Sequence, residues 1–305
     1  MGQRVVSPVL RHFLLATLIW LTACGCDRSP PSTQPSQPAQ SAERKPAAPT
    51  VASLVPAATD LILGMGAGAH LVAVSNWDAP RDDIQTLPRV GDYRSIDWEK
   101  LGALKPDVMI VQFREDKMPA GLRERADELH VKLVNVKNNR LDDLYATIRQ
   151  LGDAINEPSK AKDAESKLKA QLDSVRARVA GKPPVSTLIT RAEPSSALAC
   201  VGGGNYLDEI LQIAGGKNVL EGGDNSYPTI DRERLLQLDP KAVLALLPGS
   251  SPQVVEQTRA FWTGVPEISA VRDGRVYVLT EPELLLPGLS VGKVAELFAA
   301  KLHPQ

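Results

Sequence analysis

Four aromatic side chains lie at the ends of predicted strands or in predicted loops, and they are the residues best suited to hold a ligand. Trp77, Tyr93, Phe113 and Tyr227 stand out because aromatic residues make up only 4% of the chain. The faces of such rings offer dispersion and stacking to a flat macrocycle or chelate. The sequence therefore predicts a binding site for a partly planar ligand. The alternative is that each ring covers the core of its own half of the protein.

Polar and small residues share these positions at the carboxyl ends of predicted strands, where two-lobed α/β proteins bind their ligands. Arg114 and Arg191 are suited to meet a carboxylate or a phosphate. The alternative is that both are ordinary surface arginines. The full set of predicted ligand-binding residues is Pro56, Ala57, Asn76, Trp77, Tyr93, Gln112, Phe113, Arg114, Arg191, Gly204, Asn205, Tyr227 and Glu281.

Motifs typical of enzymes and metal sites are missing or out of context. Residues 64–69 fit a dinucleotide fingerprint by letters, but they follow a predicted helix instead of linking a strand to a helix. The sequence has no Gly-Lys-Ser/Thr phosphate loop. His70, His130 and His303 stand far apart, and we interpret each as a surface or interface histidine. We therefore expect no catalysis, no metal site and no resident cofactor.

Two runs of alternating strand and helix signals must position the candidate residues. Such alternation predicts parallel sheets with helical crossovers. In the first run we predict strands over 51–55, 71–74, 108–111 and 131–134, and helices over 56–63, 96–104 and 120–129. In the second run we predict strands over 185–190, 242–247 and 275–279, and helices over 206–214, 232–238 and 290–302.

A long polar helical region separates the two runs. The apolar stripe of one amphipathic helix is formed by Leu144, Ile148, Leu151 and Ile155. Pro158 suits the first turn of a second helix, which we expect to end at Val179, before a Gly-Lys-Pro-Pro stretch. At 1.5 Å per residue this helix is about 33 Å long. The two halves are therefore expected to share a single, stiff connection.

The first fifty residues predict where the protein works. An apolar run over 13–21 follows a basic start; it is too short for a membrane span, which takes about 20 apolar residues, but suits a secretory signal. Small residues then precede Cys24, the pattern of a bacterial lipoprotein signal in which this cysteine is lipidated. The alternative is a removed signal peptide with an incidental cysteine. Residues 27–50 are rich in Pro, Ser, Gln and Ala and predict a flexible linker.

Composition sets the remaining bounds. The formal net charge of −1 argues against a nucleic-acid partner. Cys200 has no evident disulfide partner, because the other two cysteines belong to the lipidation segment. The predicted division of the chain is a signal peptide over 1–23, Cys24 with a linker over 24–50, an α/β lobe over 51–140, a helical connection over 141–181 and a second α/β lobe over 182–305.

The order of these motifs resembles the periplasmic binding proteins of ABC importers whose lobes are joined by a single helix, the vitamin B12 and ferric-siderophore group. The most distinctive stretch runs from Gly91-Asp92-Tyr93 through Asp97-Trp98-Glu99-Lys100-Leu101 to residues 104–110. Further matching segments, which extend the resemblance over residues 51–304, are 53–60, 71–75, 215–219, 227–233 and 286–288. The Pro-Ala-Ala-Thr stretch that begins at Pro56 favours the vitamin B12 branch.

The resemblance implies two Rossmann-like α/β lobes joined by one long rigid helix, with a ligand cleft between the lobes. It implies a monomeric, lipid-anchored extracytoplasmic protein that delivers a corrinoid to the permease subunits of an ABC importer. A ferric siderophore or haem is the alternative ligand, and a sensor lipoprotein recruited away from transport is the alternative role. The family docks on its permease through one glutamate per lobe, and the matching positions are Glu99 and Glu233. Alternatively, both are simply solvated helix residues.

Overall fold

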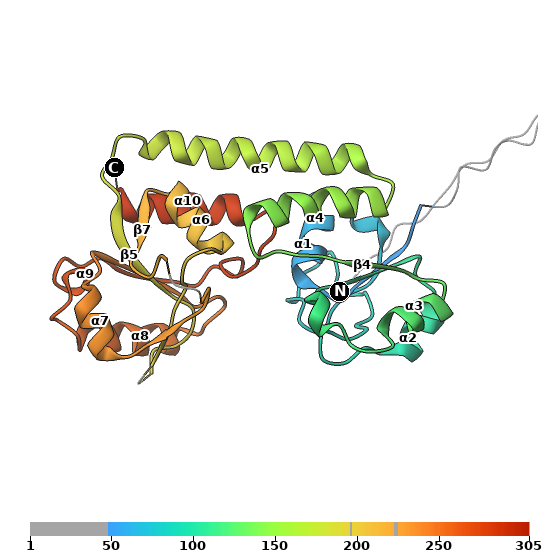
Figure 1. Cartoon of the computed structure of the whole chain (residues 1–305), viewed down its shortest axis with the longest axis horizontal. Coiled ribbons are helices and arrows are strands. Elements are labelled where there is room, and N and C mark those ends of the chain that lie inside the picture. Colours follow the sequence, from blue (N-terminus) through green and yellow to red (C-terminus); the bar gives the residue numbers. More distant parts are fainter. Residues whose placement is uncertain (1–47, 196, 223–224, 305) are drawn as a thin grey trace, which may run out of the picture. The chain divides into compact units, whose positions relative to one another are not determined.

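Two four-stranded parallel sheets, one in each lobe, form the framework of the protein (Figure 1). The computed structural model describes residues 48–195, 197–222 and 225–304. The predicted signal peptide, Cys24 and the linker up to residue 47 lie outside the described residues. The long helix α5 (Pro158–Val179) links the two lobes, with the bounds expected from the sequence.

The first lobe contains the sheet β2-β1-β3-β4, in which every pairing is parallel. Its strands are β1 (Val51–Ser53), β2 (Leu71–Ala73), β3 (Val108–Val111) and β4 (Lys132–Asn135). All four residues of the central strand β3 are buried, as expected for a parallel sheet covered on both faces. Its helical elements are α1 (Pro56–Gly64), η1 (Gly68–His70), α2 (Trp98–Leu104), η2 (Glu115–Lys117) and α3 (Leu122–Glu128).

The second lobe contains the sheet β10-β9-β5-β7 and a short antiparallel pair of strands, β6 and β8. The strands are β5 (Val185–Thr190), β6 (Leu198–Ala199), β7 (Gly216–Asn218), β8 (Thr229–Ile230), β9 (Ala242–Leu246) and β10 (Val276–Leu279). The helices are α6 (Tyr206–Ile213), α7 (Arg232–Leu238), α8 (Pro252–Thr263), α9 (Ser269–Arg272) and α10 (Val291–Leu302).

Helix α4 (Leu141–Ala154) leads from the first lobe into α5, and the two helices pack along each other. The predicted stripe is the buried face of α4, with Leu144, Ile148 and Leu151 fully enclosed. Gly152 allows the close approach, because a Cβ atom at this position would lie 2.3 Å from the Cβ atom of Ala161 on α5. Helix α5 also contacts α10, so one apolar cluster extends from the first lobe through α4 and α5 to the second.

Helices α2 and α7 are built alike and occupy equivalent places in the two lobes. Asp97 and Asp231 are their N-caps, and each carboxylate accepts a hydrogen bond from the backbone N–H three residues on. Each helix ends at a residue in the left-handed conformation, Lys105 and Asp239, with φ of 48° and 36°. Each then leads through a proline into a buried central strand.

The interpretation of His70 as a surface or interface residue is wrong. Its side chain is buried, and Nδ1 lies 2.7 Å from the carbonyl oxygen of Pro49. Its Nε2 atom faces Glu157 at the start of α5, 3.5 Å away. His70 therefore holds the first described residues against the body of the protein.

Candidate functional site

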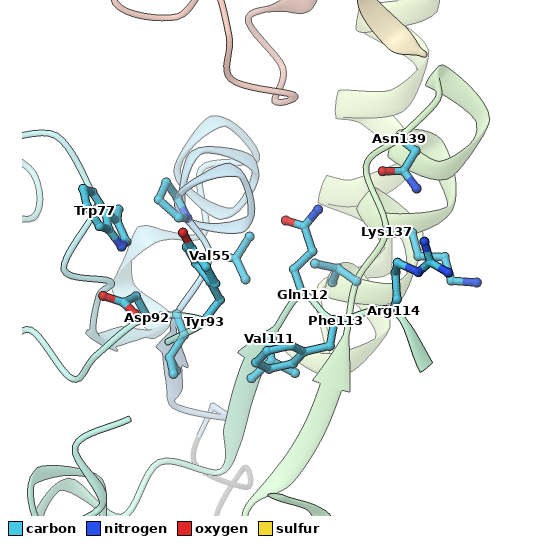
Figure 2. Close-up of a pocket in the computed structure, with 13 residues that line it drawn as sticks. Val55, Trp77, Asp92, Tyr93, Val111, Gln112, Phe113, Arg114, Lys137 and Asn139 are labelled. Atoms are coloured by element: carbon cyan, nitrogen blue, oxygen red, sulfur yellow. The ribbon is translucent and has the colours of Figure 1, made fainter. Parts of the chain in front are cut away.

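A pocket of about 400 Å³ opens at the carboxyl ends of β1, β3 and β4 (Figure 2). Strand ends collect side chains here because parallel strands terminate at one edge of the sheet. The lining residues are Leu54, Val55, Pro56, Trp77, Asp92, Tyr93, Val111, Gln112, Phe113, Arg114, Val136, Lys137 and Asn139. Six residues predicted from the sequence are brought together in this pocket, namely Pro56, Trp77, Tyr93, Gln112, Phe113 and Arg114.

Two aromatic rings stand open to solvent at the pocket. Trp77 is 59% exposed and Tyr93 is 56% exposed, the largest values among the big apolar side chains of the described residues. In Figure 2 Trp77, Asp92 and Tyr93 lie on one side, and Arg114, Lys137 and Asn139 lie on the other, with Gln112 and Phe113 between them. Such exposed rings do not cover the core of the lobe. They are available to stack on a ligand.

The turn that carries Tyr93 is organised by the buried carboxylate of Asp92. Its Oδ1 atom accepts hydrogen bonds from the backbone N–H groups of Arg94 at 2.7 Å and Ser95 at 3.2 Å. Its Oδ2 atom accepts one from the Asn76 side chain at 3.3 Å. The Arg94 N–H is the main cause that lowers the pKa of Asp92, with Ser95 and the Asn76 and Trp77 side chains adding to it. Asp92 is therefore an anion at the pocket.

The carboxylate of Asp78 stabilises the turn that carries Trp77. Its Oδ2 atom accepts hydrogen bonds from Ser75 N at 2.8 Å and from the Thr59 hydroxyl at 3.2 Å. Burial raises the pKa of Asp78 above its ordinary value, although these hydrogen bonds and nearby arginines oppose that effect. Arg89 donates to the carbonyl oxygens of Ser75 and Asp78. The Trp77 ring thus projects from a turn whose backbone is fixed on both sides.

Two cationic side chains lie on the far side of the pocket. Arg114 forms an ion pair with Asp116 at 3.0 Å, so part of its charge is already neutralised. Lys137 has no carboxylate within ion-pair distance among the described residues. Sequence reasoning missed Lys137 and Asn139. Their positions could have identified them, because Lys137 and Asn139 come shortly after β4 in the same way that Gln112 and Phe113 come after β3.

The remaining first-lobe candidates do not line the pocket. Ala57 is buried in the first turn of α1, directly after the pocket residue Pro56. Asn76 is exposed, and its side chain donates to Asp92. Each of the two residues is the sequence neighbour of a pocket residue and supports the wall of the pocket.

None of the second-lobe candidates lines this pocket, which is lined by the first lobe alone. Arg191 stacks over the Tyr227 ring, with its guanidinium carbon 5.0 Å from the ring centre. Burial raises the pKa of the Tyr227 phenol, and the charge of Arg191 opposes the shift. Tyr227 is 41% exposed, so this pair presents an accessible aromatic face.

The other three second-lobe candidates have different surroundings. Asn205 is buried as the N-cap of α6, where its side-chain oxygen accepts from Leu207 N and Asp208 N. Gly204 has φ of 74° and donates its N–H to Asp208. Glu281 accepts from Thr280 N at 3.0 Å and is exposed. Asn205 and Gly204 thus serve the local fold of the second lobe.

The two glutamates expected to dock are exposed in the first turns of the matched helices. Glu99 is the second residue of α2, and Glu233 is the second residue of α7. The same capping hydrogen bond in the two lobes gives each glutamate the same place on its helix. Neither carboxylate forms an ion pair with another described residue.

One motif that bears on catalysis is present in the second lobe. Residues 288–292 read Gly-Leu-Ser-Val-Gly, which fits the letters of a hydrolase nucleophile elbow. An elbow requires a strand that turns directly into a helix, whereas eight residues separate β10 from Gly-Leu-Ser-Val-Gly, and α10 begins at the valine of this stretch. The Ser290 hydroxyl is buried without a hydrogen-bond partner in the described part of the chain. It therefore has no base to activate it.

The described residues contain no cluster of three or more His, Cys, Asp or Glu side chains placed to hold a metal ion. None of their helices is both long enough and apolar enough to cross a membrane.

Comparison with known proteins gives one coherent result. The Periplasmic binding protein family profile matches residues 51–283. The vitamin B12-binding protein of Pectobacterium carotovorum is 27% identical over 239 residues, which cover 77% of this chain and 84% of that protein. The solved periplasmic vitamin B12-binding protein of Vibrio cholerae matches with a TM-score of 0.69 and 23% identity, over 84% of this chain and 96% of that one. The periplasmic haem-binding protein of the same organism matches with a TM-score of 0.73 and 20% identity, over 84% and 99%.

Proposed function

Because this chain belongs to the periplasmic binding protein family, we propose that it is the lipid-anchored substrate-binding protein of an ABC importer and carries cobalamin or another corrinoid to the permease. A member of this family binds its substrate and performs no chemistry on it. The Gly-Leu-Ser-Val-Gly stretch fits this view, since its serine is buried and has no base beside it.

The observation that carries the choice of ligand is the pair of open aromatic rings, Trp77 and Tyr93, at a pocket of about 400 Å³. A corrin ring is broad and partly planar, and such rings gain dispersion energy against its face. The vitamin B12-binding relatives support the same ligand class. Tyr227 with Arg191 offers a further aromatic face on the second lobe.

Isothermal titration calorimetry tests the ligand. Residues 48–305 are titrated with cobalamin and, separately, with cobinamide, which lacks the nucleotide. Binding with one-to-one stoichiometry supports the corrinoid proposal, and cobinamide reports whether the ring itself is recognised. If neither compound gave heat or changed the Trp fluorescence, the corrinoid proposal would be excluded.

Glu99 and Glu233 are proposed to dock the loaded protein on the permease. Exposed charges give specificity and association rate, so their loss should slow delivery without changing ligand affinity. The test compares the Glu99→Ala/Glu233→Ala double variant with Glu124→Ala, which removes an exposed glutamate from the first turn of α3. Uptake should collapse in the double variant alone. Normal uptake by the double variant would exclude the docking role.

The lipid anchor is proposed from Cys24 and the leader that precedes it. We expect cleavage after residue 23 and retention of the body at a membrane by residues 24–50. Cys24→Ser should release the protein into the soluble extracytoplasmic fraction, whereas Cys26→Ser should leave it bound to the membrane. If Cys26→Ser released the protein and Cys24→Ser did not, Cys26 would be the lipidated residue.

A specific contact favours haem or a ferric siderophore as the second candidate ligand. The Tyr93 phenol oxygen lies at the pocket and accepts a hydrogen bond from Arg94 Nε at 3.0 Å. A tyrosine oxygen is a known protein ligand of haem iron. Haemin titration followed by absorbance, with Tyr93→Phe as the matched variant, tests it. An iron spectrum unchanged by this substitution would leave Tyr93 as a stacking residue only.

A further inference from the structure

The turns that carry Trp77 and Tyr93 are separate in sequence but share one side chain. Asp92 belongs to the second turn, where its Oδ1 atom accepts from Arg94 N at 2.7 Å and Ser95 N at 3.2 Å. Its other oxygen accepts from the side chain of Asn76, the neighbour of Trp77, at 3.3 Å. The two oxygens of one carboxylate thus face two different turns.

The backbone supports this connection at one further point. Asn76 N donates to the carbonyl oxygen of Gly91 at 2.9 Å. Gly91 has φ of 118°, and a Cβ atom there would lie 2.2 Å from the carbonyl oxygen of Ser95, so the tight turn needs glycine. The position of Asp92 is therefore fixed, and the side chain of Asn76 is within its reach.

We propose that Asp92 is a positioning residue that couples the Trp77 turn to the Tyr93 turn and thereby sets the spacing of the two rings that hold the ligand. This inference rests on the proposed function, because it gives the two rings a common ligand. Asp92 lines the pocket but is only 7% exposed, so its carboxylate is available mainly to the protein. Rings held in advance spare the ordering cost that loose loops incur on binding.

The substitution Asp92→Asn separates coupling from local turn formation. Its amide oxygen still accepts the two backbone N–H groups, but its NH₂ group cannot accept from Asn76. A role confined to the Tyr93 turn predicts a variant that behaves as the wild type. The coupling role predicts weaker binding, because the Trp77 turn is released. Asp97→Ala is the control, since it removes another aspartate that caps backbone N–H groups in the same region without lining the pocket.

The decisive experiment is a double-mutant cycle on the full chain in detergent, with whichever of cobalamin or haemin binds the wild type. Asp92→Asn and Asn76→Ala should each weaken binding by about fivefold to tenfold, and the double variant by no more than either one, because both remove the same contact. Affinities equal to the wild type, or losses that multiply in the double variant, would overturn the proposal.

A ligand-free measurement judges the same proposal independently of the ligand. Hydrogen exchange of the backbone amides at 75–78 should accelerate severalfold in Asp92→Asn, although the substituted residue lies in the other turn. Unchanged protection there would refute the coupling. If the wild type binds neither compound, the ligand assignment fails while the exchange result still decides the role of Asp92.

Discussion

The carboxylate of Glu209, in the second lobe, accepts a hydrogen bond from Leu141 N at 2.7 Å and so caps the first turn of α4. The same carboxylate accepts from Arg140 Nε at 2.8 Å. Nearby, Tyr206 N donates to the carbonyl oxygen of Asn139, which is itself a residue of the first-lobe pocket. The start of α4 is thus hydrogen-bonded to α6. These contacts hold the lobes together in addition to the covalent link through α5.

We expect Glu209→Ala to lower the free energy of unfolding by about 1–3 kcal/mol, since a charged acceptor is lost while its backbone donor stays in place. Urea denaturation followed by circular dichroism measures the change. Glu256→Ala is the control, because that glutamate pairs with Arg259 within one exposed helix face and should cost less than about 0.5 kcal/mol. Equal effects of the two substitutions would show that the cap contributes nothing.

Two glycines within helices should respond to alanine in opposite directions. Gly152→Ala places a Cβ atom 2.3 Å from the Ala161 Cβ atom, which must move α4 away from α5. We expect a loss of about 1–3 kcal/mol in unfolding free energy. Gly102→Ala meets nothing closer than Leu129 Cδ2 at 3.7 Å. It should stabilise the protein by about 0.5–1 kcal/mol through helix propensity.

Thermal and urea unfolding of both glycine variants tests this pair of expectations. Stabilisation by both substitutions would mean that α4 and α5 have room to separate at no cost. Destabilisation by both would mean that the short helix α2 gains nothing from a better helix former.

Asp107 should make stability depend on pH in the acid range. The Thr50 N–H at 2.7 Å, followed by the Thr50 hydroxyl at 2.8 Å, lowers the pKa of Asp107 below its ordinary value of 3.8. A carboxyl whose pKa is lower in the folded state adds stability above its unfolded pKa and loses it as the pH falls through the folded pKa. The contribution is therefore present at neutral pH and absent in strong acid.

Asp107→Asn should lower stability at pH 7 by about 1 kcal/mol or less, because the site is exposed. The difference from the wild type should shrink as the pH falls below 3.8. Urea unfolding at several pH values between 7 and 2.5 measures it, with Asp127→Asn as a surface control. A difference that stays constant over this range would assign the effect to lost geometry rather than to charge.

Trp77→Ala should weaken binding of the proposed corrinoid by at least about 1 kcal/mol if the ring stacks on the ligand. Trp98→Ala is the matched control, because Trp98 is on α2 and does not line the pocket. Calorimetry with both variants gives the comparison. Affinity unchanged in Trp77→Ala would show that the exposed indole is not a ligand contact.

The sequence predicted the central elements of the fold because their signals are local. Helix α5 has a proline at its first position and Gly-Lys-Pro-Pro after its end, so both of its bounds were found. Helix α8 was missed because Thr258 and Trp262 are its only buried residues, which leaves the apolar stripe incomplete. The short strand β7, Gly-Lys-Asn, has no strand propensity of its own and exists through its pairing with β5.

The first-lobe pocket was predicted in part because strand ends reveal which residues share an edge. Lys137 and Asn139, which follow β4, line the same pocket and are absent from the predicted set. Asp92 belongs to the Gly-Asp-Tyr motif, but its bridging contact to Asn76 joins two turns and has no sequence signature. Asn205 was assigned to the ligand although an asparagine directly before a helix is also the usual N-cap, which is the place the structure gives it.

Cys200 is a free, fully buried thiol in the described part of the chain, and burial raises its pKa to about 12. Thiol reagents attack the thiolate, so the native cysteine of the body is silent toward maleimides at neutral pH. The body is therefore a ready-made scaffold for single-site labelling. A fluorophore on a cysteine engineered at the exposed Leu236 of α7 would be the only dye attached to residues 48–304. Binding of the labelled protein to a membrane partner could then be measured by fluorescence, and the ligand pocket would carry no label.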